Sequence, residues 1–504
     1  MKAVWWIKKD FRILDNQCIS RAVEECSEIL PFFCWEPSLI NEDDYSSFHL
    51  QANWQALSGL CLSLIKRKSY PRIVFGDVIH ELNKLYGIYS FDRLYSHVET
   101  GNLNSFNRDK KVGEWCRRKG VQWIEITQNS VFRGANAEKR RNLLTKRDYR
   151  REGLISDPNE ISSPVRKGLR SNNFEWNDLC KKTVKFSGVK LSPSLQKADE
   201  KSAHATLNDF LEHRGLGYSG GISSPNTAFD HGSRLSVHLT LGTLSLRTIF
   251  SELSKKRNFI KGNNEISKKW KKSLRAFESR LHWRDHFIQR LESFPNMENF
   301  TLNPAYQNLK YENNSEFLEL WLAGQTGFPM IDASMRCLKN TGFLNFRMRA
   351  MVVSFACFGL HLSWRFIHEP LAGVFTDYEP GIHLSQLQMQ AGVNGFNTIR
   401  VYSPKKQFLD HDPDAKFVKK WIPELEKYTS VEIANAPDVV LSGYASPCID
   451  LNSRSRKMKD RIFEIRKGNE GIRQTNKTLS KHGSKWNQSR KRKKQQDPQM
   501  KLTF

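Results

Sequence analysis

The sequence predicts an N-terminal α/β domain, with a parallel sheet and covering helices, followed by a larger all-α domain and a basic disordered tail. Short apolar runs alternate with amphipathic stretches over the first 130 residues, which is the pattern of a parallel sheet with crossover helices. Helical patterns then follow one another from about residue 201 to 468. Beyond that point the chain is rich in Lys, Arg, Asn, Gln and Ser, a composition typical of disorder.

Five segments of the first domain (residues 1–130) are the candidate strands. Each is a short apolar run bounded by charged or turn-forming residues, and amphipathic stretches such as 54–66 lie between them. The runs are VWWI at 4–7, ILPFFCW at 29–35, RIVFG at 72–76, FDRLYSH at 91–97 and VQWIEIT at 121–127. Strands that alternate with helices favour parallel pairing, because a parallel connection needs a crossover.

The rest of the chain divides into three segments. Residues 131–200 are polar and proline-containing, so we expect a connecting segment with some helix. Residues 201–468 contain successive amphipathic stretches, among them LNDFLEH and KSLRAFESRLHWRDHFIQRLE, and are expected to form the helical domain. Residues 469–504 are expected to form the basic disordered tail.

The formal net charge of +26 makes an anionic partner the first expectation. Residues 451–504 hold 17 Lys and Arg against 4 Asp and Glu, so half of the excess lies in the last ninth of the chain. The other half is spread over the part that is expected to fold. DNA or RNA is the leading partner class and a membrane surface the second, while a solvated basic protein is the alternative.

The cysteines and the N-terminus bear on the compartment and on metal binding. The nine Cys show no CxxC and no regular spacing, which argues against a zinc or iron–sulfur site and favours reduced thiols in the cytoplasm. The opening MKAVWWIKKDFRI lacks the apolar region of a secretion signal, and the longest apolar run, near 350–364, is too short to span a bilayer. We therefore expect a cytoplasmic protein without a metal site and without a membrane partner.

The stretch 345–425 carries most of the chemical information. It places Arg347, Arg349 and Arg365 among Met, Val and Phe on segments that have buried-helix patterns. Buried arginines must form ion pairs or bind an anion, because a lone buried charge is costly. With the aromatic residues around them, they predict an internal site for a large, flat, phosphate-bearing cofactor.

The GxGxxG match at 215–220 does not predict a Rossmann fold, because a helical pattern precedes it and a Ser/Pro loop follows.

Several motifs, taken in order, resemble the DNA photolyase and cryptochrome family. The opening VWWIKKDFRILDN is similar to the family's first strand and following loop. Tyr218 with ISSP and then SRLSVHLTLGTLS (233–245) is similar to its flavin-phosphate segment. HWRDHF (282–287), GQTGFPMIDASMRCL (324–338) and the 345–425 stretch continue the match, which covers nearly everything to about residue 467. The resemblance implies FAD as the cofactor of the helical domain.

The resemblance also implies which residues bind FAD. Those expected at its phosphates, where the family holds the cofactor in a U-shape, are Tyr218, Ser233, Arg234, Leu235 and Ser236. Hydroxyl and free N–H groups at a helix start suit a pyrophosphate, although the same pattern serves as an ordinary N-cap. Those expected around the flavin ring are Arg284, Arg349, Asp377, Glu379 and His383. A buried Arg–Asp pair there would favour an anionic reduced flavin, although such a pair can also be only structural.

For catalysis and DNA binding the resemblance points to two tryptophans and two arginines. Trp283 matches one aromatic wall of the cavity that stacks a flipped-out pyrimidine dimer, although it could also be a core aromatic. Trp364 matches the middle member of the tryptophan relay that rereduces the flavin. Arg347 and Arg400 match positions near DNA phosphates, with a solvated surface arginine as the alternative.

Eight positions depart from the family pattern. They concern one phosphate contact, the lesion pocket, flavin protonation and the electron relay. They are Gly232 for Thr, Arg280 for Glu, Phe346 for Asn, Glu379 for Asp, His383 for the Asn beside flavin N5, Met389 for the second aromatic wall, and Leu387 and Tyr311 for the inner and outer relay tryptophans. Photoreduction would then need another aromatic route or an external reductant.

These residues favour a deoxyribodipyrimidine photolyase, a light-driven DNA repair enzyme that acts on cyclobutane pyrimidine dimers. The first alternative is a cryptochrome, a blue-light photoreceptor that binds FAD without repair activity. Repair of the (6-4) photoproduct is less favoured, because Asn345 stands where that class relies on His. A nucleic-acid-binding protein without flavin would leave the 345–425 stretch unexplained.

Two further partners follow from the resemblance and from the chain end. The N-terminal domain resembles the family's antenna domain, which implies a possible second chromophore, a folate or a deazaflavin. The last six residues, QMKLTF (499–504), resemble the peptide by which bacterial repair proteins bind the sliding clamp, although chance similarity is the alternative for so short a match.

Overall fold

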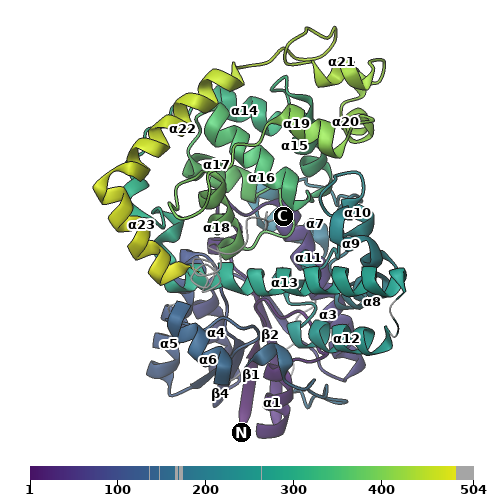
Figure 1. Cartoon of the computed structure of the whole chain (residues 1–504). Helices are drawn as coiled ribbons and strands as arrows, with labels where there is room; N and C mark the ends of the chain where they lie inside the picture. The colour runs from purple at the N-terminus through teal and green to yellow at the C-terminus, as the bar shows by residue number, and fades with distance from the viewer. Residues whose placement is uncertain are drawn as a thin grey trace.

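The computed structural model describes residues 1–135, 137–146, 148–164, 169, 174–260, 262 and 264–483, and all statements below concern these residues. An α/β region at the N-terminal end lies beneath a larger helical region (Figure 1). The predicted fold class is confirmed. The domain boundaries stay predictions.

The sheet has the five predicted strands: β1 (Lys2–Trp6), β2 (Glu28–Trp35), β3 (Arg72–Phe75), β4 (Arg93–His97) and β5 (Gln122–Ile126). Their order is β3-β2-β1-β4-β5, and all neighbours pair in parallel. In β1, Val4 lies opposite Leu30 of β2 and Leu94 of β4, so β1 is the central strand. The connections change direction beside β1, which creates the kind of crevice in which α/β proteins bind ligands.

Helices cover both faces of this sheet. They are α1 (Gln17–Glu25), α2 (Pro37–Ile40), α3 (Ser47–Lys66), α4 (Val78–Ile88) and α5 (Leu103–Lys119). Trp5 packs in a core with residues of α1 and α3, while its neighbours Val4 and Trp6 pack with residues of α4 and α5. Successive side chains of a strand point to opposite faces, so the continuous apolar run in β1 is explained by burial on both sides.

The connecting segment packs in part against the α/β region. Its described elements are α6 (Ala137–Lys146), η1 (Tyr149–Arg151), α7 (Trp176–Lys182) and η2 (Val184–Phe186). Trp176 and Phe186 are buried in the same core as α1 and α3, which ties the segment to the sheet.

The helical region contains short and long helices around its own core. In chain order they are α8 (Glu200–Glu212), η3 (Arg214–Gly217), α9 (Tyr218–Gly221), α10 (Ala228–His231), α11 (Ser236–Leu241), α12 (Leu246–Phe259), α13 (Glu265–Ser293), η4 (Pro295–Glu298), η5 (Pro304–Tyr306), α14 (Ser315–Ala323), α15 (Pro329–Thr341), α16 (Phe346–Ser354), the π-turn η6 (Phe355–Gly359), α17 (Trp364–Ala372), α18 (Pro380–Gln390), α19 (Pro404–His411), α20 (Lys416–Trp421), η7 (Pro423–Leu425), α21 (Ser430–Ala434), α22 (Leu451–Lys467) and α23 (Asn469–His482). No described helix is both long and apolar enough to cross a membrane.

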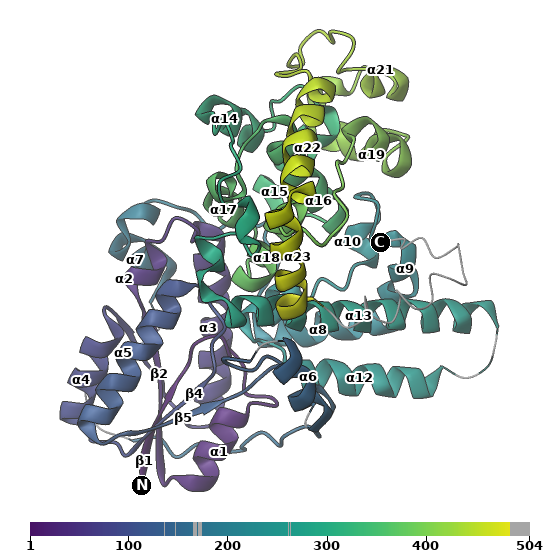
Figure 2. The same cartoon turned by 60° about the vertical axis from the view of Figure 1, so that its left-hand side comes forward.

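Helix α13 has 29 residues and lies next to the candidate site. It runs between the α/β region and the helical region in Figure 1, and Figure 2 shows it beside α12, to which the Arg257–Glu278 ion pair joins it at 2.6 Å. Asn264 caps its start by accepting a hydrogen bond from the backbone N–H of Ser267. It packs against α18, and both helices contribute residues to the candidate site.

One expectation is wrong. Residues 469–482, predicted to be disordered, form helix α23. The composition is polar, but the helix docks through small and polar side chains: Thr475 accepts a hydrogen bond from Asn303 Nδ2 at 3.1 Å, and Thr478 and His482 are buried. Tertiary contacts of this kind leave no apolar stripe in the sequence. Residues 484–504, the rest of the predicted tail, lie outside the described residues.

Candidate functional site

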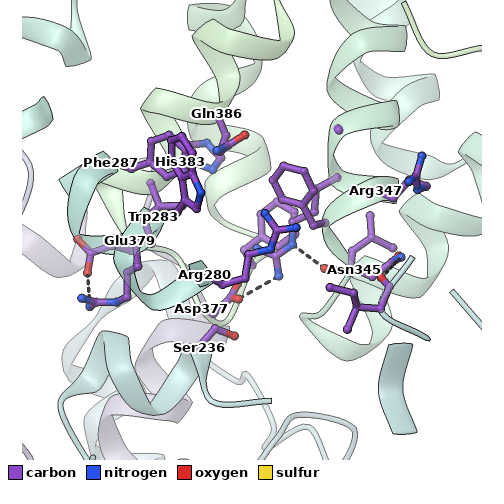
Figure 3. A pocket seen from close by; sticks show the side chains of 18 of the residues that line it. Ser236, Arg280, Trp283, Phe287, Asn345, Arg347, Asp377, Glu379, His383 and Gln386 are labelled. Carbon is purple, nitrogen blue, oxygen red and sulfur yellow. Dashed lines mark hydrogen bonds and ion pairs between the residues drawn. The ribbon is translucent and has the colours of Figure 1, made fainter. Parts of the chain in front are cut away.

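A cavity of about 650 Å³ lies in the helical region. Its walls come from the segment 218–240, from α13, from the loop 343–345 with α16, from 371–390 including α18, and from the segment that follows α18. Figure 3 shows the side chains of 18 of the residues that line it. Every residue predicted for cofactor or DNA binding lines this one cavity: Tyr218, Ser233, Arg234, Leu235, Ser236, Trp283, Arg284, Arg347, Arg349, Asp377, Glu379, His383 and Arg400.

Arg234 is the strongest candidate for an anion contact in the 218–240 wall. Its guanidinium lies over two aromatic rings, 4.5 Å from the centroid of Phe229 and 3.8 Å from that of Phe343. Burial lowers the pKa of Arg234 to about 10, so the group stays charged. Its Nη1 is buried without a hydrogen-bond partner in the described part of the chain. The helix α11 that follows has only six residues, so the arginine, more than a helix dipole, would attract a phosphate here.

The backbone around Gly232 explains why glycine replaces the family's Thr at this position. A Cβ at this position would lie 2.5 Å from the carbonyl oxygen of Ala228, which is backbone and cannot move aside easily. The local backbone therefore has no room for the Thr of other family members. The hydroxyls of Ser233 and Ser236 remain on the same wall.

The predicted Arg349–Asp377 pair is formed. Arg349 Nη2 lies 2.9 Å from Asp377 Oδ2, and Arg349 Nε donates to the carbonyl of Leu344 at 2.6 Å. The guanidinium also covers the ring of Phe375, 4.1 Å from its centroid. Burial works to raise the pKa of Asp377, but Arg349 and the Ser236 hydroxyl lower it further than burial raises it, so Asp377 is a carboxylate.

Arg284 and Glu379, both predicted near the flavin ring, form a looser contact. The atoms Arg284 Nη2 and Glu379 Oε2 are 3.8 Å apart, and the same nitrogen donates to the carbonyl of Leu239 at 3.2 Å. Burial raises the pKa of Glu379, against the opposing effects of Lys9 and Arg284. This carboxyl group therefore protonates more readily than Asp377. Glu379 occupies the N-cap position of α18 without a capping hydrogen bond from its side chain, while Arg284 comes from α13.

His383 belongs to a buried group of neutral histidines. Its ring centroid is 5.2 Å from those of His368 and Tyr378, and its Nε2 donates to the carbonyl of His368 at 3.2 Å. Burial, reinforced by His368, holds the pKa of His383 well below its usual value, and burial likewise lowers the pKa of His368 to about 4. A neutral His383 that donates through Nε2 keeps Nδ1 as a hydrogen-bond acceptor.

The loop that carries Asp377 is anchored to the α/β region. His49 of α3 accepts a hydrogen bond from the backbone N–H of Ser46 through Nδ1, and its Nε2 therefore donates to the carbonyl of Phe375, at 2.8 Å. Tyr378 donates its hydroxyl proton to Asp44 Oδ2 at 2.7 Å. Both ends of the loop are thus held by the N-terminal region.

The unsatisfied polar atoms of the cavity fit a dinucleotide of the flavin type. Arg234 Nη1, Asn345 Oδ1, Asp377 Oδ1 and Glu379 Oε1 are all buried and lack a partner within the described ranges. Buried polar groups are normally paired, so a ligand that offers both anionic oxygens and ring N–H or hydroxyl donors is the natural complement. FAD offers both. The residues therefore fit the cofactor that the sequence predicts.

Comparison with known families decides the classification. The family model described as DNA photolyase matches residues 3–147, and that described as the FAD-binding domain of DNA photolyase matches residues 277–464. Together they span both regions of the fold. The chain belongs to the DNA photolyase/cryptochrome family.

The relatives within this family carry two kinds of name. The chain is 28% identical to a deoxyribodipyrimidine photo-lyase of Vibrio cholerae, over 92% of this chain and 99% of that protein. It is 24% identical to a chloroplastic/mitochondrial cryptochrome DASH of Solanum lycopersicum, over 84% of this chain and 77% of that protein. An archaeal photolyase from Sulfolobus tokodaii, solved with two FAD molecules, superposes with a TM-score of 0.76 at 25% identity, over 92% of this chain and all of that one.

The predicted lesion wall is present in part. Trp283 lines the cavity from α13 and stacks with Phe287 one turn further on, at 5.5 Å between centroids and 30° between planes (Figure 3). Met389, at the position of the family's second wall, lines the cavity as a flexible apolar side chain. Arg280 and Phe346 also line it, so every departure noted in the sequence except Tyr311 lies in contact with the same space.

Trp364 is the predicted residue that the structure leaves outside the site. It is fully buried in the helical core and is not among the described lining residues. The guanidinium of Arg365 lies 4.5 Å from its ring centroid. Leu387, at the position of the inner relay tryptophan, lines the cavity. Tyr311, at the position of the outer one, packs against the core. The relay role of Trp364 stays a prediction.

Sequence reasoning missed several lining residues of the photolyase/cryptochrome cavity. Asn345, considered only for an alternative lesion, donates from Nδ2 to the carbonyls of Ile222 and Ser223 at 3.1 and 3.0 Å and so joins two walls. Phe287 and Arg290 were not singled out at all. Their spacing from Trp283, four and seven residues on one helix, is the signal that could have found them.

Proposed function

We propose that this protein is a deoxyribodipyrimidine photolyase, which uses light-driven electron transfer from reduced FAD to split cyclobutane pyrimidine dimers in DNA. The observation that carries the proposal is that one cavity holds both sets of residues. The cofactor-type groups Arg234, Arg349 and Asp377 share it with the Trp283–Phe287 stack. A cofactor and a flat lesion would therefore meet in the same enclosed space.

Each group of residues has a distinct task in this proposal. Arg234 and the serines beside it would hold the phosphates, and the Arg349–Asp377 pair would fix charge next to the ring. Trp283 would offer a stacking face to a base that has left the duplex. Arg347 and Arg400 on the lining would contact strand phosphates, and the basic surface would give salt-sensitive duplex binding.

A cryptochrome-type photoreceptor is the second candidate. It is favoured by Met389 in place of the second aromatic wall and by Leu387 in place of a relay tryptophan, both of which face the cavity. Relatives named cryptochrome DASH and relatives named photo-lyase are found at similar identity. Sequence similarity therefore does not separate the two.

A repair assay separates them. The purified protein, with FAD reduced, is incubated with an oligonucleotide that contains one thymine dimer, under blue light or in darkness. We expect thymine absorbance at 260 nm to return only in the light. Bound FAD and a light-dependent spectral change without any return of absorbance would reject the repair proposal and support the photoreceptor.

We also propose a second, light-harvesting chromophore in the N-terminal region. The support is the Sulfolobus tokodaii structure, whose description names two FAD molecules and a light-harvesting cofactor. A folate or a deazaflavin is the expectation from family resemblance. Extraction of pigments from protein purified from its own host, followed by mass spectrometry and by measurement of the FAD-to-protein ratio, tests this: one FAD per chain and no other pigment would contradict it.

The terminal peptide QMKLTF (499–504) is proposed to bind the sliding clamp; it lies outside the described residues. Removal of 499–504 should abolish capture by immobilised clamp and leave the FAD content unchanged. Equal capture of the shortened chain would reject the idea.

A further inference from the structure

Arg290 is a cavity residue that neither the sequence motifs nor the proposed cofactor contacts explain. It lies on α13, seven residues after Trp283 and three after Phe287, so the three side chains share one face of the helix. All three line the cavity. The guanidinium carbon of Arg290 lies 5.2 Å from the ring centroid of Phe287 and 5.6 Å from that of Phe396.

Among the described residues, no acid balances the charge of Arg290. The residue is only 5% exposed. Its Nε donates to the carbonyl of His482 at a long 3.4 Å, and its Nη1 is buried with no hydrogen-bond partner among residues that the structure describes. Within the same residues no acid forms an ion pair with it. Burial lowers the pKa of Arg290 to about 10, so the group is still a cation at neutral pH.

The described residues around Arg290 add no negative charge to balance it. Burial lowers the pKa of His286 well below its usual value and that of His482 to about 4, and in both cases Arg290 lowers it further. Both rings are therefore neutral. Asp285, on the same helix, is engaged by Arg284 at 3.5 Å and by Arg150 at 3.6 Å. A buried guanidinium in such a setting destabilises the fold unless an anion binds to it.

We propose that Arg290 anchors a binding subsite for one phosphodiester group of the DNA strand whose damaged bases enter the cavity. The inference rests on the proposed DNA repair function. The shared helix face places the subsite next to the Trp283–Phe287 stack, where the bases would lie. Asn397 completes it: its Oδ1 is buried without a partner within the described chain, and a half-turn of the amide would present the Nδ2 donor instead.

The phosphates of FAD are the other source of such an anion. The cofactor-type residues Arg234, Ser233 and Ser236 lie on the 232–240 wall, whereas Arg290 shares its part of the lining with Phe396 and Asn397. The unpaired Nη1 of Arg234 already offers a contact for the cofactor. The strand phosphate is therefore the ligand assigned to Arg290.

The test is the variant Arg290→Met, which keeps the length of the side chain and removes its charge. Binding of a dimer-containing single strand is measured in darkness by fluorescence anisotropy, from about 50 to 200 mM salt. We expect the slope of log affinity against log salt to fall by about 0.7, the contribution of one phosphate contact in a single strand. FAD content is measured by absorbance and should not change.

Two controls make the result specific. Arg336→Met removes an arginine that is paired with Glu424 at 2.8 Å and is absent from the cavity lining, and it should leave the salt slope unchanged. Arg290→Lys keeps a cation, so its slope should stay near that of the original chain. The melting temperature without DNA should rise in Arg290→Met, because a buried unpaired charge is removed; a purely structural arginine would give a fall.

A chemical substitution in the DNA locates the contact. Neutral methylphosphonates replace, one at a time, the phosphate within the dimer and those that flank it. At one position the affinities of the original protein and of Arg290→Met should become equal. An unchanged salt slope in Arg290→Met, or a loss of FAD with an unchanged slope, would overturn the proposal. Because all of these readings are taken in darkness, they hold or fail separately from the repair assay.

Discussion

At the scale of single residues, the site combines satisfied and unsatisfied charges. Asp377 has one oxygen bonded to Arg349 and a second, buried oxygen without a partner in the described structure. Glu379 is near Arg284 but not hydrogen-bonded to it, and burial raises its pKa. The cavity thus offers one fixed carboxylate and one carboxyl group that protonates more easily.

Asp377→Asn should destabilise the protein by about 2 kcal/mol at pH 7, because Arg349 loses its charged partner. The folded-state pKa of Asp377 lies below its usual value of 3.8. Its stabilising effect is therefore complete above about pH 4 and is lost as the pH falls through the lower folded-state value. Urea unfolding of both proteins at pH 7, 5 and 3.5 measures this. A difference that grows toward pH 3.5 would contradict the assignment.

The sequence predicted the individual site residues better than their state. The ordered motifs identified the groups at Tyr218, Arg234 and Asp377, and the structure places them on one cavity. The sequence could not show that Arg234 and Arg290 each keep a buried Nη1 without a partner in the described part of the chain, because pairing depends on which distant segment folds over a side chain. For Trp364 the motif predicted a place in the electron relay. The structure shows that the side chain is buried in the core, and its relay role stays a prediction.

At the scale of elements, α13 does the most to build the site. It presents Arg284 to the flavin-type pocket, and Trp283, Phe287 and Arg290 along a face that a strand of DNA would follow. The helical period predicted this helix. The period alone did not separate the face that lines a cavity from a face that packs against protein, since both carry aromatic residues.

Trp283→Ala should weaken binding of a dimer-containing oligonucleotide in darkness by about 5- to 100-fold, the range that loss of one stacking contact gives. Trp283→Phe keeps a ring and should lose less. FAD content should stay the same in both, because the side chain stacks on Phe287 and forms no ion pair with the cofactor-type residues. Equal dark affinity of the Ala variant and the original would show that Trp283 is only a packing residue.

The element that sequence reasoning missed, α23, is explained by tertiary contacts. The carbonyl of His482 accepts from Arg290, and Thr475 accepts from Asn303. These contacts connect the end of α23 to the cavity wall. The composition of residues 469–482 predicted disorder because it shows only how polar the segment is. It does not show which backbone and side-chain groups of the segment form hydrogen bonds with other parts of the chain.

At the scale of the whole molecule, charge is expected to control DNA binding. Removal of residues 484–504 deletes seven Lys and Arg and one Asp. The shortened protein should bind undamaged duplex DNA more weakly, with a shallower dependence on salt. It should retain its FAD and its preference for a dimer over undamaged DNA. Anisotropy titrations at several salt concentrations measure both, and an unchanged salt slope would show that the terminal segment does not contact DNA.

The contacts of His49 with the Phe375 carbonyl and of Tyr378 with Asp44 have a consequence for folding. The two regions differ in architecture, yet the loop that completes the pocket is held in place by the first of them. Neither region can then loosen without disturbing the other, so heat or denaturant should unfold both in one cooperative transition. For the same reason, the helical region produced without the N-terminal region should bind the cofactor weakly.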